Sequence, residues 1–262
     1  MTMSSPQKID LFGLGFDRVT MRSAVERCVT WCLESREPHT VLTANAAILC
    51  MKRRDVSLDD ACRSADLVVP DGASVVWAAR LAGTPLPERI PGVDLMVELL
   101  EAAAAKRLGV FFLGGRREVV TRLVEICERD HPSLVVAGAR DGYFKESEQA
   151  SVIEVIERSG AHMLFVGMPS PFKEVFCQRN RASLGVPVMV GVGGSFDVLA
   201  GFIRRAPVAI QRMGLEWFWR LCMEPRKLWK RYLVTNTEFV WLTARLVFER
   251  RFGWHGSREI GS

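Results

Sequence analysis

Short apolar segments alternate with longer amphipathic segments through most of this 262-residue chain, and this alternation is the strongest constraint on its fold. The apolar segments, most of them rich in Val or Phe, lie at residues 40–43, 67–69, 110–113, 134–137, 163–166 and 188–192. Helix-length segments lie between them, for example at residues 95–106, 118–130 and 148–159. Repeated strand and helix units predict an α/β fold with a largely parallel, Rossmann-like sheet and helices on both faces.

Five of the predicted strands end in small, polar or glycine-rich turns. The turns read Thr43-Ala44-Asn45, Pro70-Asp71-Gly72, Gly114-Gly115, Gly167-Met168-Pro169-Ser170-Pro171 and Gly191-Val192-Gly193-Gly194-Ser195. Parallel sheets bind ligands outside the carboxyl ends of their strands, where glycine admits close approach and helix N-termini favour anions. A single such turn is explained by chain reversal alone, but five together predict a site for a nucleotide diphosphate. No turn matches GxGxxG or GxxxxGK[ST], so the common dinucleotide and P-loop sites are not supported.

Asp71 is the most suggestive carboxylate in the sequence. It follows an apolar strand directly and lies in a turn that Pro70 and Gly72 restrict. A carboxylate held at the mouth of a crevice can serve as a general base. The competing interpretation is that Asp71 only caps the next helix, which is expected to start near Ala73.

Histidine and cysteine patterns give no support for a metal site. The four histidines share no ligand spacing with one another or with the seven cysteines, and no Asp-x-Asp pair is present. The cysteines form no CxxC pair and their number is odd, which favours reduced, mostly buried thiols in a cytosolic protein. We expect no metal and no cofactor, and we find no pattern of a signal peptide near the N-terminus.

The last 59 residues, 204–262, differ in character from the rest of the chain. They hold five of the seven tryptophans and a net charge of +7, whereas residues 1–203 carry a net charge of −2. Apolar residues recur at helical spacing at Leu228, Tyr232, Phe239, Leu242 and Leu246, and the stripe is widened by Trp229, Leu233, Val240 and Val247. Such a helix packs on protein, lies on a membrane surface or binds nucleic acid; the third is least favoured because no nucleic-acid motif accompanies the charge. No charge-free run is long enough to span a bilayer.

An ordered set of motifs resembles one family of enzymes. The motifs are Thr43-Ala44-Asn45, ADLVVPDG at 65–72, RIPGVDLM at 89–96, FLGG at 112–115, GVGGSFD at 191–197, and Arg205-Ala206-Pro207 with GLEW at 214–217. Each is weak alone, but the set in this order is specific and runs from about residue 9 to residue 245. On these residues the chain resembles the WecG/TagA/CpsF glycosyltransferases.

The resemblance implies an inverting, metal-independent hexosyltransferase. Its donor would be a UDP-sugar carrying N-acetylmannosamine, its uronic acid, glucose or a related sugar, and its acceptor a polyprenyl-diphosphate-linked sugar. The reaction would serve the synthesis of surface polysaccharide or exopolysaccharide of the bacterial cell envelope. The enzyme would act at the cytoplasmic face of the membrane, and nucleic acid would not be a partner. A different class of function, a non-catalytic nucleotide-binding scaffold of a polysaccharide assembly complex, stays open, as does assembly into a homo-oligomer.

The resemblance also implies roles for particular residues. Asp71 would be the base, with Thr43 and Asn45 near the donor or acceptor pocket. Further substrate-binding positions are expected at Arg80, Gly92, Asp94, Gly114, Gly115, Lys173, Glu174, Gly193 and Gly194. Cations expected to close over the diphosphate are Arg205, Arg220, Arg226, Lys227 and Lys230. We therefore expect a catalytic domain at residues 1–203 and a helical appendage for membrane association and diphosphate binding at residues 204–262.

Two positions depart from the pattern that many members of this family share. Ser74 replaces the second glycine of PDGxG, and Lys173 stands in SPFKE where a neutral Gln is common. Lys173 could favour a donor with a carboxylate, or it could pair with Glu174 or with a phosphate. The donor sugar therefore stays open at this point.

Overall fold

A computed structural model of the chain describes residues 8–35, 37–223 and 225–252. Its centre is a six-stranded sheet of β3 (His39–Ala44), β4 (Leu67–Pro70), β5 (Gly109–Gly114), β6 (Val135–Arg140), β7 (Met163–Gly167) and β8 (Val188–Gly191). All neighbours are parallel and the order is β4-β3-β8-β7-β5-β6. The six predicted strands and the α/β class are confirmed.

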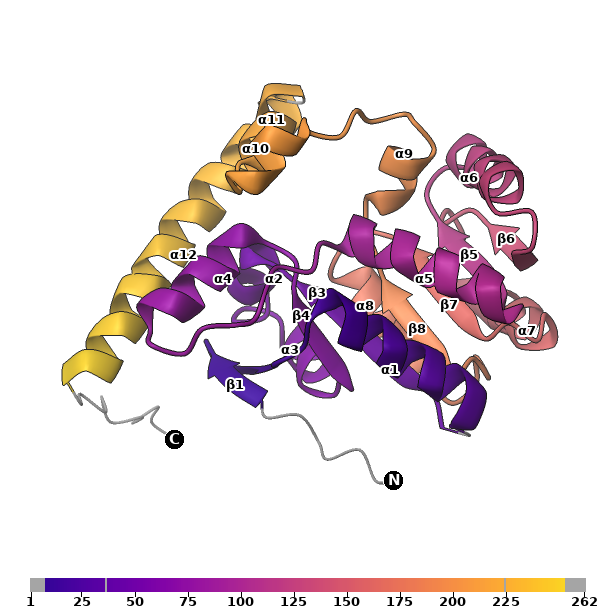
Figure 1. Cartoon of the computed structure of the whole chain (residues 1–262), viewed down its shortest axis with the longest axis horizontal. Coiled ribbons are helices and arrows are strands. Elements are labelled where there is room, and N and C mark those ends of the chain that lie inside the picture. The colour runs from indigo at the N-terminus through magenta and orange to yellow at the C-terminus, as the bar shows by residue number, and fades with distance from the viewer. Residues whose placement is uncertain (1–7, 36, 224, 253–262) are drawn as a thin grey trace.

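Helices cover both faces of this sheet (Figure 1). One face packs against α1 (Met21–Glu34), α5 (Gly92–Lys106), α6 (Arg117–Asp130) and the short α9 (Ser195–Leu199). The other face packs against α2 (Ala46–Met51), α3 (Val56–Arg63), α4 (Ala73–Leu81), α7 (Gln149–Arg158) and α8 (Phe172–Arg179). A 3₁₀ turn (Glu146–Glu148) precedes α7. Strand residues alternate between the two cores: Phe112 and Phe165 face the first, and Phe111 and Leu164 face the second.

A two-stranded antiparallel hairpin, β1 (Lys8–Leu11) and β2 (Leu14–Asp17), precedes the sheet and was not expected from the sequence. Its two-residue turn places Phe12 at φ 58° and Gly13 at φ 71°, as a tight hairpin turn requires. The buried carboxylate of Asp17 accepts a 2.9 Å hydrogen bond from the backbone N–H of Val68 on the edge strand β4. The hairpin therefore covers part of an otherwise open sheet edge.

The chain ends in α10 (Val208–Arg212), α11 (Glu216–Met223) and the long α12 (Pro225–Phe252). Figure 1 shows α12, in yellow, running beside α2 and α4. Phe239 and Leu242 are buried in the same core as Leu49 of α2, and the ring of Phe239 lies 5.3 Å from that of Phe12. The second half of α12 is therefore part of the hydrophobic core.

The apolar stripe of α12 divides into two faces. Phe239, Leu242 and Leu246 pack inward, whereas Leu233 and Val240 are 63% and 66% exposed. Trp229 and Trp241 are also exposed. Packing on protein, one of the three interpretations of the stripe, thus accounts for the inward face, and the outward face is left to solvent or another partner. Among the described helices, none combines the length and apolar content needed to cross a bilayer.

The cysteines behave as small buried hydrophobic residues, as the sequence predicted. All seven are free, and six are buried, with Cys222 the exposed one. Burial raises the pKa of Cys32, Cys62 and Cys177 to about 12, so these thiols carry almost no thiolate at neutral pH.

Candidate active site

Asp71 lies directly after β4, and both of its carboxylate oxygens are hydrogen-bonded. Oδ1 accepts a 2.8 Å bond from the backbone N–H of Gly92, and Oδ2 accepts a 3.3 Å bond from Asn45 Nδ2. Gly92 is the first residue of α5, so the carboxylate lies at the N-terminus of that helix, where a negative charge is favoured. The N-cap of α4 is Gly72 and makes no side-chain cap. Asp71 is therefore bound to the N-terminus of α5 and does not cap the helix that follows it.

Asn45 fixes the second oxygen of Asp71 because its own amide is held in place. It is the N-cap of α2, and its Oδ1 accepts hydrogen bonds from the backbone N–H groups of Ala47 and Ile48. That arrangement turns Nδ2 toward Asp71. The proximity of Asn45 and Asp71 follows from the adjacent positions of β3 and β4 in the sheet.

Thr43 and Gly92 complete this end of the crevice. Thr43 is buried and donates a 2.9 Å hydrogen bond from Oγ1 to the carbonyl of Gly191, which joins the ends of β3 and β8. A Cβ atom on Gly92 would lie 3.4 Å from Thr43 Oγ1, so the glycine lets α5 begin close to the strand ends. Thr43, Asn45, Asp71 and Gly92 thus form one cluster at the carboxyl edge of the sheet.

The glycines after β5 and β8 serve close packing more than hydrogen-bond donation. Gly114 has φ 135°, and a Cβ atom there would lie 2.5 Å from the backbone of Gly167. The N–H of Gly115 donates to the carbonyl of Gly167, and that of Gly193 donates to the carbonyl of Val166. Two of the N–H groups expected to face a nucleotide are therefore already used within the protein. The glycines let neighbouring groups approach the strand ends closely, as the ring of Phe196 does at Gly167.

Arg220 reaches this glycine edge from the C-terminal segment. Its guanidinium rests against Gly194, since a Cβ atom on Gly194 would lie 3.0 Å from Arg220 Nη2. The Nε atom is buried without a hydrogen-bond partner among the described residues. Because β8 lies two strands from β4, Gly194 and Asp71 are separated by roughly 10 Å along the sheet edge. The Asp71 carboxylate and the Arg220 guanidinium thus lie at the same carboxyl edge of the sheet, at the ends of β4 and β8.

Lys173 and Glu174 form a buried ion pair at the start of α8. Both side chains are more than nine-tenths buried, and Ser170 Oγ donates a 2.7 Å hydrogen bond to Glu174 Oε1, the oxygen that also binds Lys173 Nζ. The methylene chain of Lys173 passes over Gly191, where a Cβ atom would lie 3.3 Å from Lys173 Cε. Glu174 Oε2 is buried and has no partner among the described residues. The positive charge of Lys173 is therefore neutralised within the protein.

Arg205 and Asp94 are brought together as an ion pair. Arg205 Nη1 lies 2.6 Å from Asp94 Oδ1 and Nη2 lies 2.8 Å from Oδ2, a bidentate geometry. Hydrogen bonding to Asp94 raises the pKa of Arg205 above its usual value. The two Nη atoms of Arg205 are therefore paired with Asp94, whereas its buried Nε has no hydrogen-bond partner among the described residues.

The remaining predicted cations lie farther from this centre. Arg80 is exposed in the last turn of α4, about 10 Å along the helix from its start at the crevice. Arg226 and Lys230 are exposed near the start of α12, with Lys230 Nζ 5.5 Å from the ring centroid of Trp229. Lys227 belongs to the same helix, but its side chain lies outside the described part of the structure.

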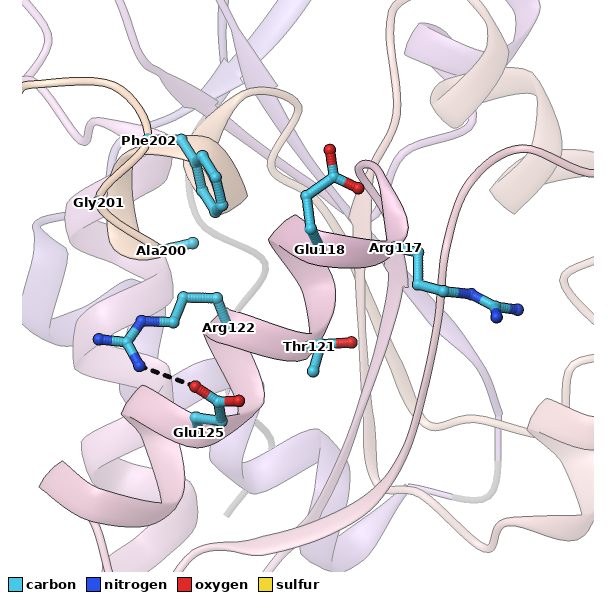
Figure 2. Close-up of a pocket in the computed structure, with 8 residues that line it drawn as sticks. All are labelled: Arg117, Glu118, Thr121, Arg122, Glu125, Ala200, Gly201 and Phe202. Atoms are coloured by element: carbon cyan, nitrogen blue, oxygen red, sulfur yellow. Dashed lines mark hydrogen bonds and ion pairs between the residues drawn. The ribbon is translucent and has the colours of Figure 1, made fainter.

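A separate surface hollow of about 570 Å³ lies between α6 and residues 200–202 (Figure 2). Figure 2 shows the side chain of Phe202 above it and the ion pair between Arg122 and Glu125 along its floor. Because α6 follows β5, this hollow is about four strand spacings, roughly 19 Å, from the end of β4. It is thus distinct from the cluster around Asp71. Within residues 8–35, 37–223 and 225–252 there is no group of three or more His, Cys, Asp or Glu side chains placed to hold a metal.

Comparison with known proteins decides the family. The sequence pattern of the family described as "Glycosyl transferase WecG/TagA/CpsF family" matches residues 9–253 of this chain. The chain belongs to that family.

Its similarity to enzymes of the family extends over most of the sequence. It is 36% identical over 220 residues to an N-acetylglucosaminyldiphosphoundecaprenol N-acetyl-β-D-mannosaminyltransferase of Bacillus spizizenii, covering 84% of each chain. It is 32% identical over 229 residues to an enzyme of the same name from Staphylococcus aureus strain MW2, covering 87% of this chain and 88% of the relative. The fold is therefore that of a glycosyltransferase of this family.

Two residues near the crevice of this glycosyltransferase were not among the predicted site residues. Arg89 Nη1 lies 2.7 Å from Glu216 Oε2, and Glu216 Oε1 lies 3.7 Å from Arg205 Nε. Both residues stood within the motifs RIPGVDLM and GLEW, but nothing in their spacing along the chain connects them. Their pairing depends on how α11 returns to the sheet, which the local sequence pattern does not specify.

Two substitutions of Asn45 distinguish its effect on the orientation of Asp71 from its effect on the stability of α2. In Asn45→Ser the hydroxyl can still cap α2, so we expect the free energy of unfolding to stay nearly unchanged. The hydroxyl cannot reach Asp71 as the amide does, so we expect the rate of sugar transfer to fall about tenfold. In Asn45→Ala the cap is lost as well, and we expect a further destabilisation of about 1 kcal/mol. Initial rates and urea unfolding measure the two effects. Full activity in Asn45→Ser would show that transfer does not depend on the hydrogen bond from Asn45 to Asp71.

Proposed function

We propose that this glycosyltransferase transfers a hexose from a UDP-sugar to a polyprenyl-diphosphate-linked sugar, with inversion and without a metal ion. The observation that carries the proposal is that Asp71, held by the N–H of Gly92, and Arg220, resting against Gly194, both lie at the carboxyl edge of the sheet. The names of the relatives support the acceptor class, because those enzymes act on N-acetylglucosaminyldiphosphoundecaprenol. Such lipid-linked sugars serve envelope polysaccharide synthesis, and we place this chain in the same type of pathway.

Asp71 acts in this proposal as the general base. Its carboxylate accepts the proton of an acceptor hydroxyl as the oxygen attacks the anomeric carbon. The new bond forms on the face of the sugar opposite UDP, and the bond between the anomeric carbon and the diphosphate oxygen breaks with its electron pair remaining on UDP. The configuration at the anomeric carbon is therefore inverted. Asn45 and Gly92 hold the carboxylate in position for this proton transfer.

Arg220 acts on the leaving group. UDP carries additional negative charge as it departs, and a preformed cation in a partly dehydrated crevice stabilises that charge. Gly193 and Gly194, which follow β8, carry no side chains of their own, so the diphosphate is proposed to lie beside them at the Arg220 guanidinium. Arg226 and Lys230, exposed on the first turns of α12, are candidates to extend the same cationic surface. These protein cations take the role that a divalent ion fills in other nucleotide-sugar enzymes.

The buried pair at the start of α8 favours a neutral donor sugar. A lysine at this position could have attracted a sugar carboxylate, but the charge of Lys173 is matched by Glu174 within hydrogen-bonding distance. An acidic sugar would therefore find no spare positive charge there. N-acetylmannosamine, the sugar transferred by the relatives, is accordingly the first donor to test, ahead of its uronic acid.

The outward face of the C-terminal segment is proposed to contact the membrane that holds the acceptor. Leu233, Val240 and Trp241 are more than half exposed on α12, and Trp217 and Phe218 are exposed on the neighbouring α11. Basic residues flank these apolar groups, which is the pattern of a helix lying in the interface of an anionic bilayer. The chain would thus be a peripheral protein of the cytoplasmic membrane face, with residues 204–262 forming its contact surface.

A donor panel tests the proposed reaction directly. The chain is incubated with a lipid-diphosphate-linked N-acetylglucosamine acceptor and, in turn, with several UDP-hexoses, UDP-N-acetylhexosamines and their uronic acids, with and without EDTA. We expect a product carrying one added neutral sugar by mass spectrometry, equally in EDTA. Asp71→Asn should reduce turnover by at least about 10³-fold with UDP binding nearly unchanged, because the amide cannot accept the proton. Binding of UDP without transfer from any donor would instead indicate a nucleotide-binding scaffold.

Two exposed residues of α12 test the membrane contact. Leu233→Glu with Val240→Glu places two carboxylates on the outward face while keeping good helix formers, so the fold should be retained. We expect co-sedimentation with vesicles of anionic phospholipid to fall about tenfold. The matched control is Val155→Glu, which changes a 49% exposed valine on α7. Equal vesicle binding by the double variant and the control would exclude this face as the contact surface.

A further inference from the structure

A chain of ion pairs ties α11 to the first turn of α5. It begins at Arg89, whose Nη1 lies 2.7 Å from Glu216 Oε2, and continues from Glu216 Oε1 to Arg205 Nε at 3.7 Å. It ends in the bidentate pair between Arg205 and Asp94. All four side chains are between 19% and 35% exposed, so they are partly shielded from water. Two positive and two negative charges alternate and sum to zero, so the chain offers little spare charge to a ligand.

Both ends of this chain lie beside Asp71. Asp94 is two residues after Gly92, whose N–H holds the Asp71 carboxylate. Arg89 is followed by Ile90, whose N–H donates a 2.8 Å hydrogen bond to the carbonyl of Pro70. Pro70 directly precedes Asp71. The ion pairs therefore fix α11 relative to the two segments that carry the proposed base.

Arg220 is the residue of α11 whose place depends on this link. It follows Glu216 by four residues, so the two side chains lie on the same face of the helix. A Glu and an Arg four residues apart on a helix often form a salt bridge. Here the carboxylate oxygens of Glu216 form ion pairs with Arg89 and Arg205 instead. The Arg220 guanidinium instead rests on Gly194, and in the described part of the chain its Nε has no hydrogen-bond partner.

The turn between α10 and α11 is seated on α4 by backbone packing. Gly214 has φ 72°, and a Cβ atom there would lie 2.6 Å from Ala73 Cβ and 2.9 Å from Trp77 Cζ2. The glycine thus brings the start of α11 against the first turn of α4. This contact sets where α11 begins but not the rotation of the helix about its axis. The ion pairs of Glu216 supply that second constraint.

We propose that Glu216 is a positioning residue that orients α11 so that Arg220 faces the crevice. Glu216 does so by pairing with Arg89 and with Arg205, which is itself held by Asp94. Arg205 is in this account a structural link and not a ligand of the diphosphate. The inference rests on the proposed function, in which Arg220 stabilises the departing UDP.

A double-mutant cycle between Glu216 and Arg220 tests this assignment. Glu216→Gln, Arg220→Met and the double variant are compared by kcat and KM for the donor, by calorimetric titration with UDP, and by thermal unfolding. We expect each single variant to lower kcat about tenfold and to weaken UDP binding. The double variant should be no more than about twofold worse than Arg220→Met alone, because Glu216 acts only through Arg220. A purely structural role of Glu216 would not give this dependence on Arg220.

The matched control is Glu238→Gln. Glu238 is on α12 and pairs with Arg53 and Arg54 at 3.9 and 2.7 Å, so its loss also removes an ion pair between the C-terminal segment and the rest of the protein. It lies away from the crevice residues, and we expect its kcat and UDP affinity to stay within about twofold of the wild type. If Glu216→Gln loses its cooperative unfolding transition, Arg205→Gln replaces it in the same cycle.

Two results would overturn the inference. The first is a Glu216→Gln variant with wild-type kcat and UDP affinity, and the second is a double variant whose losses are the product of the single losses. Failure of the proposed function looks different: the wild type would then transfer no sugar from any UDP-sugar donor. The cycle measured by UDP titration alone would in that case still decide whether Glu216 positions Arg220.

Discussion

The hydrogen bond from the backbone N–H of Gly92 to the carboxylate of Asp71 holds the functional part of this structure together. It joins the end of an edge strand to the first residue of a helix that begins 21 residues later. Because the donor is an unpaired N–H at a helix N-terminus, it favours a negative charge on Asp71 and fixes its direction. Asn45 on the neighbouring strand end binds the other oxygen, so three segments meet at one carboxylate.

The C-terminal segment depends on this centre and completes it. Its long helix is anchored in the core by Phe239 and Leu242, so removal of residues 201–262 would expose part of that core as well as remove Arg220. A truncation is therefore a poor test of a separable appendage, and point substitutions in α11 are more informative. One face of α12 stabilises the fold while the other remains exposed, and it is this exposed face that we propose contacts lipid.

Much of the fold follows from the sequence because it depends on local patterns. The six strands are apolar runs of Val, Leu and Phe, and Asp71 is conspicuous because it follows such a run between proline and glycine. The hairpin at Lys8–Leu11 and Leu14–Asp17 was missed since its turn carries Phe12 before Gly13, where Asn or Asp would be the usual signal. The sequence did not distinguish the inward face of α12 from the outward face, because apolar residues recur at helical spacing on both. The partners of Arg205 and Lys173 were also beyond the sequence, since a charge alone does not show which charge lies opposite.

The proposed reaction needs the base, Asp71, and the cation for the leaving group, Arg220, to reach one bound UDP-sugar from the carboxyl edge of the sheet. A crystal structure of the chain with bound UDP measures this most directly. We expect the diphosphate to lie at the carboxyl ends of β7 and β8, within hydrogen-bonding distance of Arg220 and on the Asp71 side of the hollow beside α6. A diphosphate bound in that hollow, with Arg220 still resting on Gly194 and out of contact, would contradict it.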